Sequence, residues 1–170
     1  MIFTRPSHRV LFLCTANVCR SPLAEALLRH RLRERGMQRR VAVASAGTRV
    51  GQPGRRPDPR ILQLCTAAGV SMRGIRARPV DLRVLDKANT VLVMQQEHLD
   101  DLVAQNVPER LLHRVQLLGR YLLPAPAAAG VDIPDPYFAD REGFVAVYDQ
   151  IDLAVGNLVD TLAESGFLAS

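Results

Sequence analysis

The sequence predicts an α/β fold, organised as a single three-layer domain with a central parallel sheet of about four strands and helices on both faces. Short apolar segments typical of buried strands alternate with segments of helical periodicity, and this alternation indicates βαβ units. The chain has 170 residues, of which 48% are hydrophobic and 23% charged, values that suit one globular domain with a substantial core. We therefore expect one domain over residues 1–170, of which residues 1–8 form a flexible N-terminal extension.

A buried strand and a capped helix begin the pattern. Residues 10–13 form the apolar run Val-Leu-Phe-Leu, which is typical of a strand buried on both faces. Ser21 is a preferred N-cap residue, and Pro22 then falls at the first helical position, where proline is favoured. The helix that starts there is expected to end near Gly36.

The same alternation continues through the middle of the chain. Residues 41–44 are expected to form a second short strand, and the Gly-, Pro- and Arg-rich residues 47–59 are expected to form a loop. A helix is expected over residues 60–68. A third buried strand is expected over residues 90–94, followed by a helix over about residues 96–103.

The last third of the chain has a weak signal for a strand, then a long loop, and then the clearest helical pattern of the sequence. Residues 115–118 predict a fourth strand. Residues 123–136 contain four prolines and one glycine and predict a long loop, a feature that is usually functional in compact domains. The final helix is predicted by apolar residues at the i, i+3, i+4, i+7 spacing, which pack against the core: Phe144, Val147, Tyr148, Ile151, Val155, Leu158, Val159 and Leu162.

The turn between the first strand and the first helix carries the chemical signal. Residues 14–22 read Cys-Thr-Ala-Asn-Val-Cys-Arg-Ser-Pro. A strand-to-helix turn directs backbone N–H groups and the positive end of the helix dipole into one concavity, which binds oxyanions. The same field favours the nucleophilic thiolate form of Cys14. Arg20 can bind two phosphate oxygens at once. The segment therefore predicts a phosphate-binding loop with a cysteine nucleophile.

Residues 10–25 resemble the low-molecular-weight protein tyrosine phosphatases. Further similarities to this family follow in order along the chain, so the resemblance extends from about Arg9 to the final helix. They lie at Ser45-Ala46-Gly47-Thr48 after the second strand, at Pro57-Asp58-Pro59-Arg60 before a helix, and at Asp135-Pro136-Tyr137 in the general-acid loop.

The resemblance implies a role for each matching residue. Cys14 would be the nucleophile, Arg20 the phosphate clamp and Asp135 the general acid, with no metal ion and no cofactor. Cys19 would form a reversible disulfide with the nucleophile and protect it from overoxidation. The remaining implied site comprises the phosphate-binding and cleft residues Thr15, Ala16, Asn17, Val18, Cys19, Ser21 and Tyr137, with Ser45 as a support of the loop.

The implied activity is metal-independent hydrolysis of phosphotyrosine in proteins through a cysteinyl-phosphate intermediate. The implied partner is a phosphotyrosine-containing protein. The resemblance is compatible with a tyrosine autokinase of polysaccharide export as this protein substrate.

Several positions depart from the family pattern, and most of them lie at the cleft rim. Ile75 replaces a histidine that joins the loop network in many members, and Gln95 stands where animal members have an aspartate. Arg49 and Val50 occupy a segment where others place a tryptophan. Two smaller departures are Ala16 in place of glycine and Phe138 in place of a second tyrosine.

Three arginines near the expected cleft suggest a substrate preference. Arg49, Arg55 and Arg56 would favour an acidic peptide around the phosphotyrosine, because guanidinium groups bind carboxylates well.

Other activities on the same fold remain alternatives. Relatives that act on phosphoarginine resemble this loop but carry threonine before the second cysteine, whereas Val18 is apolar and favours a phenyl ring. A thioredoxin-coupled arsenate reductase needs further resolving cysteines, and none follows Cys65. A non-catalytic phosphotyrosine-binding module would be indicated by loss of Cys14, Arg20 or Asp135, all of which are present.

Composition argues against nucleic-acid binding. The formal net charge is +5 and almost all the positive charge is arginine, which suits an anionic substrate, an acidic partner or nucleic acid. Aromatic residues make up only 5% of the chain and tryptophan is absent, so no stacking platform for single strands is expected.

The remaining features predict a cytoplasmic monomer without membrane insertion. No apolar run has the length of a membrane span or of a signal peptide's hydrophobic region. Cys14 and Cys19 have a spacing near that of zinc ligands, but no second Cys/His pair accompanies them. The histidines show no catalytic spacing and are expected at the surface or in packing: His8, His30, His98 and His113.

Overall fold

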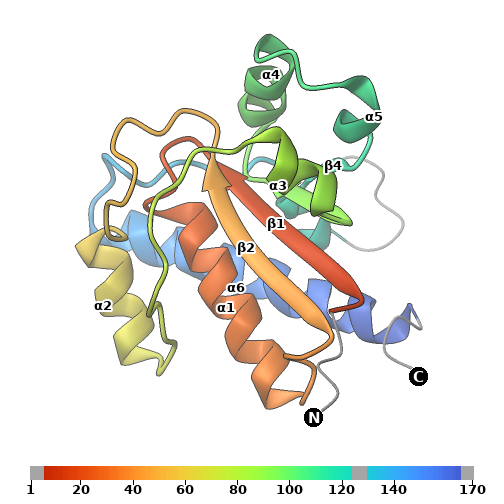
Figure 1. Ribbon diagram of the computed structural model, residues 1–170. Helices are drawn as coiled ribbons and strands as arrows, with labels where there is room; N and C mark the ends of the chain where they lie inside the picture. Colours follow the sequence, from red (N-terminus) through yellow and green to blue (C-terminus); the bar gives the residue numbers. More distant parts are fainter. Residues whose placement is uncertain (1–5, 124–129, 166–170) are drawn as a thin grey trace.

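Four parallel strands form the centre of the protein, as predicted. The structure, a computed structural model, describes residues 6–123 and 130–165 (Figure 1). The strand order is β2-β1-β3-β4, so β1 lies inside the sheet and pairs with β2 and β3. The bounds are β1 His8–Cys14, β2 Val41–Gly47, β3 Thr90–Val93 and β4 Val115–Leu117.

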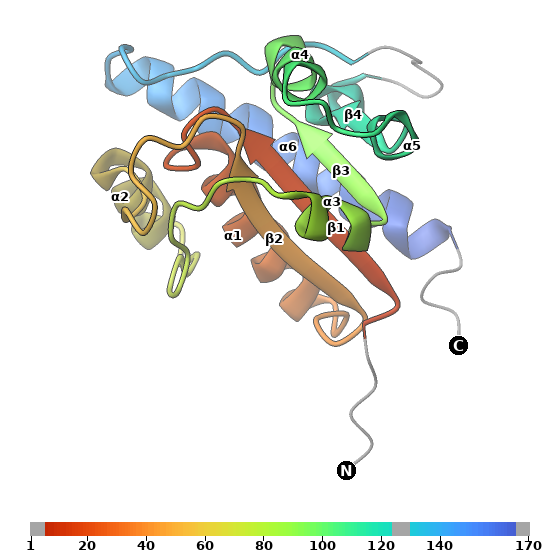
Figure 2. The same cartoon turned by 45° about the horizontal axis from the view of Figure 1, so that its top comes forward.

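Helices cover both faces of this sheet and complete the three layers (Figures 1 and 2). One face carries α1 Arg20–Glu34, α2 Pro59–Ala67 and α6 Arg141–Glu164. The other carries α3 Leu82–Lys87, α4 Gln96–Ala104 and α5 Glu109–Leu112. A 3₁₀ turn, Leu118–Leu122, follows β4. Among the described residues, no helix is long and apolar enough to cross a bilayer.

The apolar run in β1 supplies both cores. Successive side chains of a strand point to opposite faces, so Val10 and Phe12 pack in the core formed with α1, α2 and α6. Leu11 and Leu13 pack in the second core with α3, α4 and α5. Residues 10–13 of β1 are therefore apolar at every position because both faces are buried, and the carboxyl end of the strand places Cys14 at the edge of the sheet where α1 begins.

Some boundaries differ from the sequence expectations. His8 is the first residue of β1 and is buried, so it does not belong to an N-terminal extension; residues 1–5 lie outside the described residues. Ser21 is not the N-cap of α1, because the helix begins at Arg20 and Cys19 holds the cap position. The hydroxyl of Ser21 instead bonds within the phosphate loop, as described below.

The described parts of the predicted long loop contain no helix or strand, and residues 124–129 lie outside the described residues. Two short helices, α3 and α5, and the 3₁₀ turn were not predicted. Each has six residues or fewer, which is too short to show helical periodicity in the sequence.

Candidate active site

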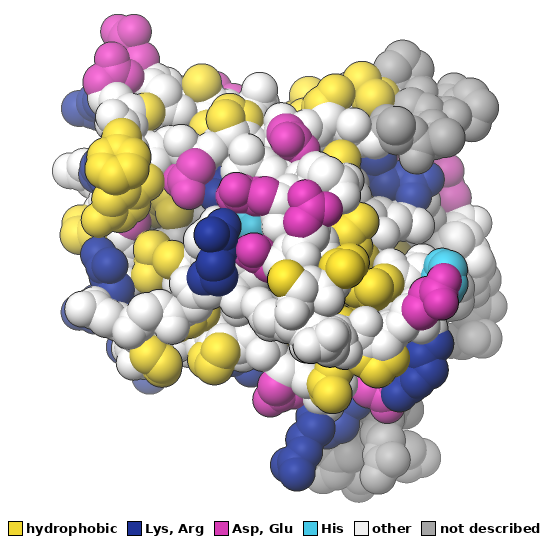
Figure 3. All heavy atoms as spheres, turned by 90° about the horizontal axis from the view of Figure 1, so that it is seen from above, with side chains coloured by type: hydrophobic (Ala, Val, Ile, Leu, Met, Phe, Trp, Pro, Cys, Tyr) yellow, Lys and Arg dark blue, Asp and Glu magenta, His cyan; other side chains and the backbone are white. Residues whose placement is uncertain are grey.

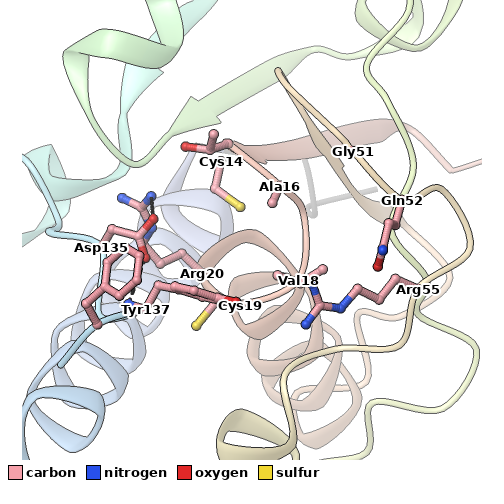
Figure 4. Close-up of a pocket in the computed structure, with 12 residues that line it drawn as sticks. Cys14, Ala16, Val18, Cys19, Arg20, Gly51, Gln52, Arg55, Asp135 and Tyr137 are labelled. Carbon is pink, nitrogen blue, oxygen red and sulfur yellow. Dashed lines mark hydrogen bonds and ion pairs between the residues drawn. The ribbon is translucent and has the colours of Figure 1, made fainter. Parts of the chain in front are cut away.

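A pocket of about 390 Å³ opens at the carboxyl end of β1, where the turn of residues 14–20 leads into α1. Figure 4 shows Asp135 and Tyr137 on one side of this pocket and Gln52 and Arg55 on the opposite side. The lining residues come from the phosphate loop, the loop after β2 and the loop before α6: Cys14, Thr15, Ala16, Val18, Cys19, Arg20, Gly51, Gln52, Arg55, Asp135, Tyr137 and Phe138.

The predicted nucleophile lies at the floor of the phosphate loop. Cys14 is 3% exposed, and its Sγ lies 2.9 Å from Oγ of Ser21. The Oγ atom of Ser21 also lies within hydrogen-bond distance of the carbonyl oxygen of Ala46, at 3.3 Å. Because α1 begins at Arg20, the positive end of its dipole faces the thiol. A hydroxyl at 2.9 Å can stabilise the sulfur as an anion, both before attack and when it departs.

The guanidinium of Arg20 is buried and held from three sides. It is 1% exposed, its Nη1 donates to Oε1 of Gln95 and to the carbonyl oxygen of Ile133 at 3.0 Å, and its Nη2 donates to Oδ2 of Asp135 at 2.8 Å. The predicted phosphate clamp and the predicted general acid therefore form an ion pair. An incoming phosphoryl group would compete with Asp135 for the same guanidinium.

The carboxylate of Asp135 is also tied to its own loop. Its Oδ1 accepts the backbone N–H of Tyr137 at 3.0 Å. Arg60 of α2 donates to the carbonyl oxygen of Tyr137 at 3.2 Å, and its guanidinium lies 5.7 Å from the centre of the Tyr137 ring. Phe138 is 96% exposed at the rim. The loop that carries the acid is thus attached to α2 and presents two aromatic rings to the pocket.

A buried polar network supports the phosphate loop from below. Asn17 has a φ of 55°, a left-handed conformation that asparagine tolerates better than most residues, and is fully buried. Its Nδ2 donates to Oγ of Ser21 and to Oγ of Ser45, both at 2.9 Å, and its Oδ1 accepts the backbone N–H of Arg78 at 3.0 Å. Ser45 donates to Glu25 at 2.5 Å. These hydrogen bonds join β2, α1 and the loop before α3.

Glu25 ends this network in a buried environment. Burial raises the pKa of Glu25, while the Ser45 hydroxyl and the Arg29 guanidinium act in the opposite direction. Ile75, one of the departures from the family pattern noted in the sequence, is buried in the core formed with α1, α2 and α6. The side chain of Arg78 donates to the carbonyl oxygen of Ser45 at 2.8 Å, so arginines support the network at this end.

Replacing Asn17 by alanine is expected to lower the free energy of unfolding by about 2–4 kcal/mol, because two buried hydrogen bonds and one partly buried hydrogen bond are lost. Urea denaturation measures this loss. Asn106 is the matched control, since it has a φ of 58° but is exposed, so Asn106→Ala includes only the backbone cost. Equal losses in the two variants would contradict the structural role of the network.

Gly47 allows the loop after β2 to pass close to the phosphate loop. A Cβ at this position would lie 2.6 Å from the carbonyl oxygen of Thr15 and 2.5 Å from Cγ2 of Val50, distances that side chains do not adopt. The backbone N–H groups of Thr48 and Arg49 then donate to the carbonyl oxygens of Cys14 and Thr15, both at 2.9 Å.

Cys19, the predicted redox partner, is 5% exposed and lines the same pocket. Burial raises the pKa of its thiol, and the neighbouring Cys14 raises it further. All three cysteines are free thiols in this structure. The two loop cysteines thus lie in one pocket, and the environment of Cys19 favours the protonated form.

The three arginines expected at the cleft are not equivalent. Arg55 lines the pocket. Arg49 instead faces α4, where its Nε lies 3.0 Å from Oδ2 of Asp101 and its Nη2 3.7 Å from Glu97. The face seen along the strands from their carboxyl ends carries acidic as well as basic side chains (Figure 3). Arg49 is therefore paired with acidic side chains of α4, whereas Arg55 is available to the pocket.

Two contacts to the loop were not predicted from the sequence. Gln95, noted only as a rim difference, accepts a hydrogen bond from Arg20. His98, expected at the surface or in packing, is fully buried and its Nε2 lies 3.1 Å from Oγ1 of Thr15. Both residues lie at the start of α4, and the only signal in the sequence was their place directly after a buried strand.

Among residues 6–123 and 130–165, no group of three His, Cys, Asp or Glu side chains is arranged to hold a metal ion. The positive charge in the pocket comes from Arg20 and Arg55.

Comparison with known proteins assigns the chain to a family. The family profile described as low molecular weight phosphotyrosine protein phosphatase matches residues 9–167, and the chain belongs to this family. A low molecular weight protein-tyrosine-phosphatase of Streptomyces coelicolor is 33% identical over 158 residues, which cover 93% of this chain and 95% of the relative.

Two solved structures show the same fold. The crystal structure of YfkJ from Bacillus subtilis has a TM-score of 0.80 at 26% identity, with 93% of this chain and 96% of that chain covered. The YwlE arginine phosphatase from Geobacillus stearothermophilus has a TM-score of 0.79 at 26% identity, with 94% and 95% covered. The fold and family are those that the phosphate-loop motif indicated.

Proposed function

We propose that this member of the family hydrolyses protein phosphotyrosine with Cys14 as nucleophile, Arg20 as phosphate clamp and Asp135 as general acid. The observation that carries this assignment is the convergence of the three side chains on one pocket, with Arg20 and Asp135 2.8 Å apart. They come from the end of β1, the start of α1 and a loop more than a hundred residues later in the chain.

The proposed reaction has two displacement steps. The Cys14 thiolate attacks phosphorus, the bond from phosphorus to the phenolic oxygen breaks, and Asp135 gives its proton to that oxygen. Water then attacks the cysteinyl-phosphate, Asp135 takes a proton from the water, and the sulfur–phosphorus bond breaks. Arg20 and the backbone N–H groups of the loop neutralise the transferring phosphoryl group throughout. The hydroxyl of Ser21 stabilises the departing sulfur.

The pocket wall favours phosphotyrosine over phosphoarginine. Val18 lines the pocket with an apolar side chain, and Tyr137 and Phe138 provide aromatic surface. A phenyl ring gains from this apolar contact, whereas the side chain of Val18 offers the guanidinium of phosphoarginine no hydrogen-bond partner. Arginine phosphatase activity is the second candidate, since the Geobacillus relative has that name and a similar fold.

The test of this assignment is hydrolysis of p-nitrophenyl phosphate in EDTA and reductant, followed by phosphotyrosine and phosphoarginine peptides. The proposal predicts activity in EDTA and a higher kcat/KM for phosphotyrosine. Preference for phosphoarginine would favour the second candidate, and binding of phosphotyrosine without turnover would indicate a binding module.

Arg55 is proposed to select acidic sequences next to the phosphotyrosine, because it lies opposite the aromatic side of the pocket (Figure 4). The variant Arg55→Glu is expected to lower kcat/KM for an acidic phosphopeptide about 3–10-fold, while hydrolysis of p-nitrophenyl phosphate changes little. Arg49→Glu is the control, since Arg49 pairs with Asp101. Unchanged peptide kinetics in the Arg55 variant would exclude this role.

We further propose that the phosphatase domain spans the chain and acts as a cytoplasmic monomer. The proposed nucleophile, phosphate clamp and general acid all lie in this chain and line one pocket, which is compatible with activity of a single copy. A reducing compartment suits a mechanism that requires a free Cys14 thiol. A tyrosine autokinase as the protein substrate stays a prediction from the family resemblance.

A further inference from the structure

A buried histidine outside the phosphate loop contacts the loop directly. His98 lies in the first turn of α4, is fully buried, and has its Nε2 3.1 Å from Oγ1 of Thr15, the residue after the nucleophile. Burial of a polar ring is costly unless its nitrogens are hydrogen-bonded. Both ring nitrogens of His98 have a hydrogen-bond partner: Nε2 contacts Thr15 of the loop, and Nδ1 contacts the backbone N–H of Gln95.

The hydrogen bonds define the tautomer of the ring. The backbone N–H of Gln95 is directed at Nδ1 of His98 at 3.0 Å. A backbone N–H can only donate, so Nδ1 is the unprotonated acceptor and the proton lies on Nε2. The Nε2–H group therefore donates to the hydroxyl of Thr15. Burial, with the nearby Arg20, lowers the pKa of His98 to about 4, so the ring is neutral near pH 7.

The residue before α4, Gln95, also contacts the phosphate clamp, Arg20. The side chain of Gln95 accepts a hydrogen bond from Nη1 of Arg20, and the backbone N–H of Gln95 is the group held by His98. The parallel pairing of β1 with β3 brings the carboxyl ends of these strands together, which places Thr15 beside the start of α4. His98 thus lies between the residue after the nucleophile and the residue that orients the guanidinium.

We propose that His98 is a positioning residue of this phosphatase: its Nε2–H fixes Thr15, and its Nδ1 fixes the Gln95 turn that holds Arg20. The proposal rests on the phosphatase function given above. His98 transfers no proton and touches no phosphoryl oxygen. Its effect is geometric, because catalysis of phosphoryl transfer depends on the placement of the clamp and nucleophile to within a fraction of an ångström.

The test is a double-mutant cycle in the full-length protein with His98→Asn, Thr15→Val and the double variant. Asparagine is too short to reach Thr15, and valine removes the hydroxyl. Each single change is expected to lower kcat for p-nitrophenyl phosphate about 3–10-fold, and the double variant is expected to lose no more than the worse single variant. His98→Gln places an amide N–H near Thr15 and is expected to recover part of kcat.

His8 provides a matched control. It is buried, and its Nε2 lies 2.9 Å from Oγ1 of Thr90, the same type of contact at the opposite end of the sheet. His8→Asn is expected to lower the melting temperature and leave kcat per folded molecule unchanged. His98→Asn is expected to lower kcat and also to weaken inhibition by inorganic phosphate, which binds the same loop.

The outcomes separate this inference from the function on which it rests. Wild-type kcat in His98→Asn, or additive losses in the double variant, would overturn the positioning role while the phosphatase activity stands. If His98→Asn does not fold, the Thr15→Val variant tests the same contact from the side of the loop. An unchanged kcat in Thr15→Val would then overturn the proposal. An inactive wild-type protein would refute the phosphatase function and this inference with it.

Discussion

Replacing Cys14 by serine is expected to abolish turnover of p-nitrophenyl phosphate, with a loss of about 10⁴-fold or more in kcat. Serine keeps the size and the contact to Ser21, but its hydroxyl is not ionised in the pocket and attacks phosphorus poorly. Binding of inorganic phosphate should remain, because Arg20 and the loop N–H groups are unchanged. Steady-state kinetics and an inhibition constant for phosphate separate these two effects.

Cys65→Ser is the control for this prediction. Cys65 is also a buried free cysteine, but it lies in α2 and does not line the pocket. Burial raises the pKa of Cys65 to about 12, which is the behaviour of an inert core thiol. Activity per folded molecule should stay near the wild-type value in this variant. Turnover that survived in Cys14→Ser would remove Cys14 from the proposed role.

Asp135→Asn is expected to lower kcat by about 10²–10⁴-fold, the usual contribution of general acid–base catalysis. The loss should be larger for phosphotyrosine than for p-nitrophenyl phosphate, since nitrophenolate leaves without full protonation. Asparagine can still accept the hydrogen bond from Arg20 that the structure shows at 2.8 Å, so the clamp should keep its place. Measurement of kcat/KM with a series of aryl phosphates tests this dependence, because kcat/KM reports the transfer of the phosphoryl group to Cys14, the step in which the leaving group departs.

The matched control for the acid is Asp140→Asn. Asp140 caps α6 by accepting the backbone N–H of Gly143 at 2.9 Å, and asparagine is an equally good N-cap residue. This variant should retain kcat for all the aryl phosphates. If the loss of kcat/KM in Asp135→Asn is the same for every leaving group, Asp135 does not donate the proton.

The local sequence predicted the parts of the site that are contiguous in the chain. The apolar run of β1, the cysteine–arginine loop and α1 follow one another, so their arrangement needs only a strand-to-helix turn. Ser21 was predicted both as the N-cap of the helix and as a residue of the phosphate site. The N-cap prediction is wrong, because its hydroxyl contacts Cys14 and Asn17 within the loop and Cys19 holds the cap position.

Contacts between distant segments could not be predicted in the same way. Arg49 appeared free to bind a substrate, but Asp101 from α4 pairs with it. His98 and Thr15 are separated by 83 positions and meet only because β3 pairs with β1. Strand order is a property of the whole fold, so the role of these residues becomes visible only in three dimensions.

The covalent intermediate on Cys14 can be detected directly from the mass of Asp135→Asn after reaction with p-nitrophenyl phosphate and rapid acid quench, followed by peptide mapping. This substrate needs little acid assistance in the first step, so the variant should accumulate the intermediate. The account predicts one added phosphoryl group, located on Cys14 and absent from Cys14→Ser. A phosphoryl group on another residue, or turnover without any covalent intermediate, would contradict the account.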